Sequence, residues 1–105
     1  MPVQEIEEMK SRLVEFLSPE RVYLFGSFAS GAGTPESDLD FYIVVPDDGQ
    51  DLAELTARAY KAVRKSKKRP VDILVGTTAA FEARKDIPSS VEREVYRKGV
   101  LLYGT

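Results

Sequence analysis

Three short apolar runs do most to limit what this chain can fold into. They are RVYLF, LDFYIVV and VDILV, rich in β-branched and aromatic residues, and each is followed by a Gly or a Pro. Runs of this length and composition are typical of buried strands. We therefore expect strands at Arg21–Phe25, Leu39–Val45 and Val71–Val75, which need helices to cover them.

Residues with helical spacing lie around these runs. Apolar side chains recur every three or four positions from Pro2 to Leu17 and again from Asp51 to Arg69, where Pro70 stops the pattern. Two more helical stretches, separated by Pro88, lead into a final GVLLY run. The segment rich in Gly, Ser and Pro between the first two strands predicts a loop with at most one helical turn at its start.

Counting that turn, the expected order is α-β-α-β-α-β-α. With 105 residues, of which 43% are hydrophobic and 30% charged, the composition is that of one globular domain, spanning residues 1–105. A tight connection makes the first two strands antiparallel, whereas a helical crossover makes the next pair parallel. The predicted fold class is α/β (α+β), a small mixed sheet covered by helices.

The chain has no His and no Cys. Imidazole bases, Ser-His triads, thiolate zinc sites and disulfides are therefore excluded, so carboxylates must carry any acid, base or metal role. The net charge of -2 argues against direct binding of duplex DNA. No leader-like or membrane-length apolar segment occurs in the sequence, and we expect a cytoplasmic location.

Asp38 and Asp40 lie two positions apart at the start of the second expected strand. Their side chains would project from one face, with Cα atoms roughly 6 to 7 Å apart. Two carboxylates so close repel each other unless a cation lies between them, and oxygen ligands suit Mg²⁺. For an isolated pair of this kind, a plain turn leading into a strand is the better explanation.

Two further features favour a metal site. Gly26–Ser27 follows the first strand, and a turn of this type directs backbone N–H groups and a hydroxyl at an anion. Asp72 interrupts the third apolar run, and the expected topology brings it to the same sheet edge, although an exposed edge-strand Asp remains the alternative. Three carboxylates can hold two divalent ions for nucleotidyl displacement, and Asp72 can also accept a proton.

The run GSFASGAGTPESDLDFYIVV resembles the G-S-x-A-x-G...S-D-x-D signature of the DNA polymerase beta-like nucleotidyltransferase superfamily. With its short length, VDILV strand and closing EREVYRKGVLLYG, the chain is similar to the minimal nucleotidyltransferase branch, antitoxin partners of HEPN-domain ribonuclease toxins. The resemblance implies a polymerase beta-like palm fold, ATP as substrate and two Mg²⁺ ions. It implies nucleotide contacts from Gly26, Ser27 and Ser37, and metal binding and catalysis by Asp38, Asp40 and Asp72.

The chain departs from that pattern at Phe28 and Ser30, where members commonly carry Arg. We expect triphosphate affinity to suffer, unless Arg84 and Lys85 supply the charge; a solvated helix face explains those two residues equally well. The basic run from Arg64 to Arg69 is interpreted as a helix C-terminus, with a patch for an acidic partner as the alternative.

Two functions compete. The first is an enzyme that transfers a nucleoside monophosphate, AMP from ATP, to a hydroxyl on a HEPN-type partner. The second is a catalytically weak or inactive antitoxin of the same fold, which blocks its partner by binding; the intact carboxylates argue against it. Transfer to a small molecule or an RNA end is a third option, but no extra domain to hold such an acceptor is expected. A monomer, a homo-oligomer and a hetero-oligomer all remain open.

Overall fold

The computed structural model describes residues 2–105. Eight helices and strands occur in this part of the chain: α1 (Val3–Leu17), β1 (Arg21–Phe25), β2 (Leu39–Val45), α2 (Leu52–Val63), β3 (Val71–Thr77), α3 (Thr78–Arg84), α4 (Val91–Lys98) and β4 (Val100–Tyr103).

The strands form one mixed sheet with the order β3-β2-β1-β4. β1 pairs antiparallel with both β2 and β4, whereas β2 pairs parallel with β3 through the α2 crossover. β2 is central, and six of its seven residues are buried. The predicted strand directions for β1, β2 and β3 are confirmed.

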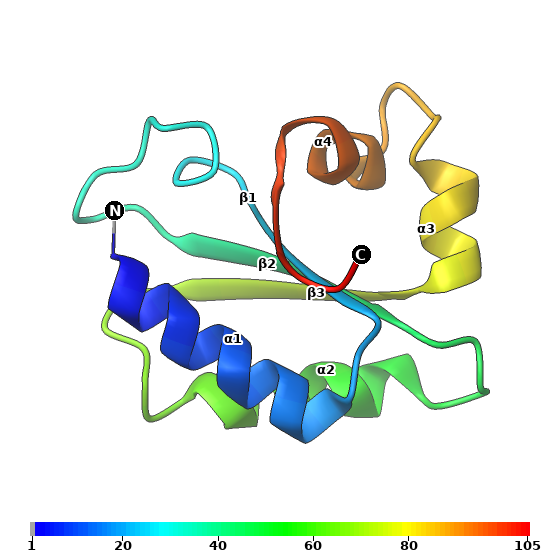
Figure 1. Ribbon diagram of the computed structural model, residues 1–105, viewed down its shortest axis with the longest axis horizontal. Helices are drawn as coiled ribbons and strands as arrows, with labels where there is room; N and C mark the ends of the chain where they lie inside the picture. Colours follow the sequence, from blue (N-terminus) through cyan, green and yellow to red (C-terminus); the bar gives the residue numbers. More distant parts are fainter. Residues whose placement is uncertain (1) are drawn as a thin grey trace.

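Helices cover both faces of the sheet, α1 and α2 on one and α3 and α4 on the other (Figure 1). Each face has its own apolar core because side chains alternate along a strand. Phe41 and Ile43 of β2 pack in the core beneath α1 and α2, while Tyr42 and Val44 pack against Phe81 on the other side. The predicted fold class, a small mixed sheet covered by helices, is confirmed.

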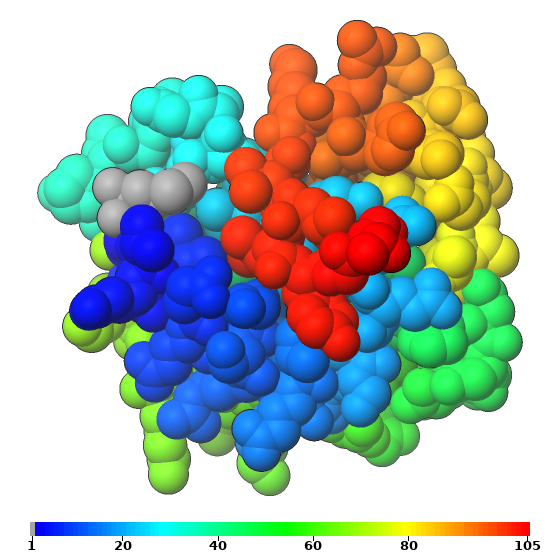
Figure 2. All heavy atoms as spheres, viewed as in Figure 1, coloured from blue at the N-terminus to red at the C-terminus, as the bar shows by residue number. Residues whose placement is uncertain are grey.

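Two details of the expected order differ. The segment after β1 forms hydrogen-bonded turns but no helix, and the final GVLLY run supplies a fourth strand, β4. β4 lies on the surface between α4 and α1, where Val100 and Leu101 are each 41% exposed (Figure 2). It becomes a strand because β1 offers it an open edge, which no local pattern encodes.

Helix α2 ends at Val63, six residues earlier than expected. Beyond it, Ser66 donates a hydrogen bond to Glu8, and the backbone N–H of Lys68 donates to the Glu5 carboxylate. These contacts with α1 draw the chain away from the helical path.

None of the helices in residues 2–105 is long and apolar enough to cross a membrane.

Candidate active site

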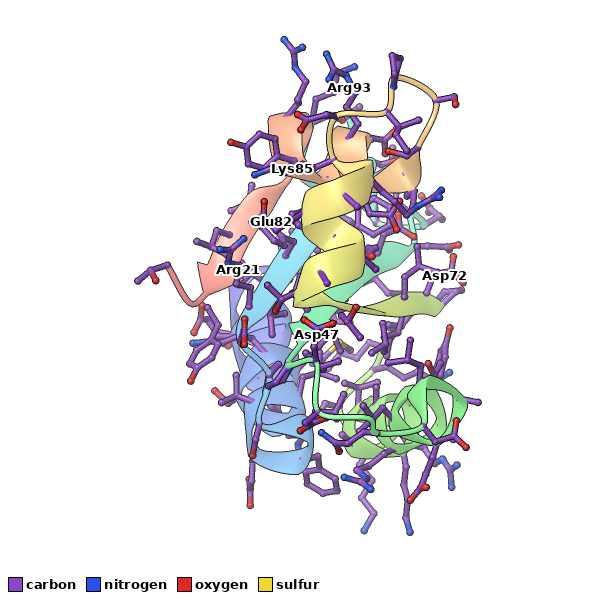
Figure 3. The ribbon with its side chains drawn as sticks, turned by 90° about the vertical axis from the view of Figure 1, so that its right-hand side faces the viewer. Arg21, Asp47, Asp72, Glu82, Lys85 and Arg93 are labelled. Atoms are coloured by element: carbon purple, nitrogen blue, oxygen red, sulfur yellow. The ribbon has the colours of Figure 1, made fainter. Side chains whose placement is uncertain are left out.

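The carboxylates predicted from the sequence gather where β2 and β3 begin. The parallel register pairs Asp40 directly with Asp72, so both side chains leave the sheet on the α3 and α4 face. Asp40 is half-buried and Asp72 is exposed; Figure 3 shows Asp72 at the rim of the molecule. Asp38 precedes β2 and is also exposed.

The environment of Asp40 disfavours its charged form. Burial, then the charges of Asp72 and Asp38, then a hydrogen bond with Asp72, raise the pKa of Asp40 from 3.8 to about 6. Glu94 on α4 adds a smaller effect in the same direction. A half-buried carboxyl surrounded by other carboxylates gains from a nearby cation, since a cation lowers the free energy of the charged form.

The turn after β1 lies against this carboxyl group. Gly26 has φ of 77°, and a Cβ atom placed on it would overlap the carboxylate of Asp40. The turn is closed by Ser30 N–H donating to the Gly26 carbonyl and by the Ser30 hydroxyl donating to the Ser27 carbonyl. Only glycine fits this position without strain, so the turn and the carboxylates form one local unit.

Ser37 occupies a different environment from Gly26 and Ser27. Its hydroxyl accepts a hydrogen bond of 2.9 Å from the backbone N–H of Thr34 and lies 3.2 Å from the Thr34 hydroxyl. These contacts close the loop that leads into Asp38.

A cavity of about 250 Å³ opens beside the turn, lined by Gly26, Ser27, Ser30, Glu94 and Lys98. A second cavity, of about 430 Å³, runs on along α4 and shares Glu94 and Lys98 with the first. Sequence reasoning missed these two residues. Their four-residue spacing places them on one face of α4, but their proximity to Gly26 depends on β4 pairing with β1.

Phe28, one of the two departures from the family pattern, turns away from this cavity. It is 7% exposed in the core formed with α1 and α2, and the guanidinium of Arg69 lies 5.2 Å from its ring centre. Ser30, the other departure, lines the cavity.

Arg84 and Lys85, the two basic residues that were one possible source of the missing positive charge, are engaged elsewhere. Arg84 Nε donates to Glu92 at 3.0 Å, and Lys85 forms an ion pair with Glu82, which Arg21 also approaches (Figure 3). Lys98 is the cation that lines the cavity beside Gly26.

Glu92 anchors α4 to the sheet. It is buried, and it accepts hydrogen bonds from the Tyr42 hydroxyl at 2.8 Å and from Arg84. Burial alone would raise the pKa of Glu92, but these two hydrogen bonds, together with a backbone hydrogen bond and the positive charge of Arg84, hold that pKa below its usual value. These hydrogen bonds hold α4 against β2 at Tyr42, which lies two residues after Asp40.

The donor set at the sheet edge consists of carboxylate oxygens, which match the preference of Mg²⁺. Within residues 2–105, no three acidic side chains are already close enough to form a metal-binding group. Asp40 and Asp72 are the converging pair, and Asp38 acts on Asp40 through its charge. The oxygen ligands that these residues offer therefore fit the chemistry of a divalent cation.

Solved structures with the same fold include an adenyltransferase and two toxin–antitoxin structures. Spectinomycin adenyltransferase AAD(9) from Enterococcus faecialis, with ATP and spectinomycin, is 17% identical with a TM-score of 0.71, covering 98% of this chain and 56% of that one. The present chain thus spans little more than half the length of that enzyme. A toxin–antitoxin with AMP-PNP is 22% identical, with a TM-score of 0.56, and the match covers 100% of this chain and 75% of that one.

A mutant of the toxin–antitoxin MntA–HpeT with two Asp-to-Glu changes is also 22% identical, with a TM-score of 0.53, and covers 96% of this chain and 73% of that one. A search of curated proteins gives no match. The nucleotidyltransferase domain family matches residues 6–102, nearly the whole length and every element from α1 to β4. The chain belongs to the nucleotidyltransferase domain family.

Proposed function

We propose that this chain transfers AMP from ATP to a hydroxyl group of a partner protein, with Asp38, Asp40 and Asp72 holding Mg²⁺. The observation that carries the proposal is the pairing of Asp40 with Asp72 directly beside the Gly26–Ser27 turn. Membership of the nucleotidyltransferase domain family supports the reaction class.

Each part of this site has a role in the transfer. The Gly26–Ser27 turn holds the phosphates through backbone N–H groups and the Ser27 hydroxyl, and Ser37 supports the loop that presents Asp38. The three carboxylates would hold Mg²⁺, as one ion or two. The bound metal would neutralise the charge of the phosphates and polarise the reacting phosphate.

The bonds exchanged are few. The acceptor oxygen forms a bond to the α-phosphorus, the bond from that phosphorus to the bridging oxygen of the β-phosphate breaks, and pyrophosphate leaves. The proton of the acceptor hydroxyl passes to the carboxylate of Asp72, which is exposed on the edge strand β3 and so is open to the incoming acceptor. The protein contributes mainly position and charge stabilisation.

We propose a HEPN-type helical protein as the acceptor. The likeness of this fold to two toxin–antitoxin structures supports a partner of that kind. The two Asp-to-Glu changes in the MntA–HpeT mutant lie two positions apart, the same spacing as Asp38 and Asp40. A nucleotide attached to a Tyr or Ser beside a ribonuclease site would repel RNA phosphates and switch the partner off.

The test is the intact mass of the protein encoded next to this chain, after co-expression with wild type, Asp38→Asn or Asp48→Asn. Asp48 is an exposed aspartate beyond the opposite end of β2, so its variant removes the same charge away from the site. We expect added nucleotidyl units with wild type and Asp48→Asn, and none with Asp38→Asn.

Equal masses with a partner that is still neutralised would favour the antitoxin that acts by binding alone. Modification by Asp38→Asn at the wild-type level would overturn the assignment of the carboxylates.

A further inference from the structure

Lys98 is placed beside the Gly26 turn by the pairing of β4 with β1. Leu24 pairs with Val100 in the antiparallel register. Continuing that register by two residues brings Lys98, the last residue of α4, opposite Gly26. The cavity of about 250 Å³ accordingly contains both residues.

Close packing at Gly99 fixes this arrangement. A Cβ atom at Gly99 would overlap the carbonyl oxygen of Val95 and would lie 3.1 Å from the carbonyl oxygen of Leu24. The end of α4 can therefore approach the end of β1 only because residue 99 has no side chain. This contact holds the backbone of Lys98 at a set distance from the turn.

The ammonium group of Lys98 has no anionic partner in the described part of the chain. Its neighbours on the same helix face include Glu94, yet none of the ion pairs among residues 2–105 involves Lys98. Arg84, Lys85 and Arg69, by contrast, are each paired with a glutamate. Lys98 is exposed and is the one cation among the five residues lining this cavity.

We infer that Lys98 binds the β- and γ-phosphates of the nucleotide, in the cavity between the Gly26–Ser27 turn and α4. The inference rests on the proposed function and adds a phosphate-binding residue to it. The turn offers backbone N–H groups and hydroxyls, which orient a phosphate but carry no full positive charge. Lys98 supplies that charge from the opposite wall, where a triphosphate tail leaving the carboxylates would extend.

The experiment compares binding of ATP and of AMP, each with Mg²⁺, to wild type and three variants of the full chain by calorimetry. Lys98→Gln should weaken ATP binding about ten- to a hundredfold, the range typical of a hydrogen bond to a charged group, and leave AMP binding unchanged. Lys98→Arg should restore ATP binding to within about threefold of wild type. Arg97→Gln is the matched control, because Arg97 lines only the neighbouring cavity.

The outcomes separate this inference from the proposed function. ATP binding by Lys98→Gln equal to that of wild type, or an equal loss in Arg97→Gln, would overturn the role of Lys98 alone. A wild-type chain that binds no ATP would overturn both. ATP binding that depends on Lys98, in a chain that transfers nothing, would retain the phosphate site and remove the enzyme. Unchanged melting temperatures of the variants would establish that each is folded.

Discussion

At the scale of single residues, Asp40 decides the character of the site. It is the half-buried member of the carboxylate group, it faces Asp72 across the β2–β3 pairing, and the Gly26 turn closes over it. A carboxyl group in this setting is costly to ionise without a cation and is well placed to bind one.

The pKa of about 6 for Asp40 has a consequence for stability without metal. Because this pKa is raised above 3.8, the folded state holds the proton more tightly, and the stability so gained is lost as the pH rises through about 6. Asp40→Asn should therefore become more stable than wild type by about 1–2 kcal/mol at pH 7.5 in chelator, after allowance for solvent screening, and by almost nothing at pH 4.

Urea unfolding of both proteins across this pH range measures the difference. A free-energy gap that stays constant from pH 4 to pH 7.5 would contradict the environment assigned to Asp40. Added Mg²⁺ should stabilise wild type at pH 7.5 and leave Asp40→Asn unchanged.

Asp72 has a separate role, because it is exposed and lies on the edge strand. Asp72→Asn should lower kcat at least a hundredfold while changing the affinity for ATP by less than about threefold, since proton acceptance is felt in the transition state. Single-turnover rates and equilibrium ATP binding measure the two quantities. A loss confined to ATP binding would assign Asp72 to the nucleotide alone.

At the scale of elements, β4 and α4 complete the site. The strands at Arg21–Phe25 and Leu39–Val45 and the whole of α1 could be predicted from composition and spacing, because their signals are local. β3 continues past Gly76 to Thr77, beyond the predicted end, because Gly76 pairs with Val44 and has no side chain to meet the Tyr42 hydroxyl. In the sequence, Gly76 indicates the end of the strand, but in the structure it is a residue of β3 that must lack a side chain for the strand to pack against Tyr42.

The position of α4 depends on Gly99. Gly99→Ala should reduce the free energy of unfolding by about 1–3 kcal/mol, because the added methyl group forces the end of α4 away from β1. ATP affinity should fall with it, since Lys98 moves away from the turn. Urea unfolding and calorimetry test both effects, and an alanine variant as stable as wild type would show that the close approach is not a constraint.

At the scale of the whole molecule, the topology turns three separated sequence segments into one site. The antiparallel β1–β2 pair and the parallel β2–β3 pair bring residues 26, 40 and 72 to one edge, as predicted from the connections. Glu94 and Lys98 could not be predicted, because their place depends on β4 adding to the sheet next to β1. The burial of Phe28 in the opposite core likewise follows from tertiary packing.

The central claim is that Asp38, Asp40 and Asp72 bind divalent metal beside a triphosphate. Its most direct test is a crystal of the full chain grown with Mn²⁺ and a non-hydrolysable ATP analogue, with anomalous diffraction used to locate the metal. The account predicts one or two Mn²⁺ peaks within about 2.0–2.3 Å of these carboxylate oxygens, separated by about 3.5–4 Å if two are present. An ordered triphosphate with no metal at these carboxylates, or with metal bound elsewhere, would contradict it.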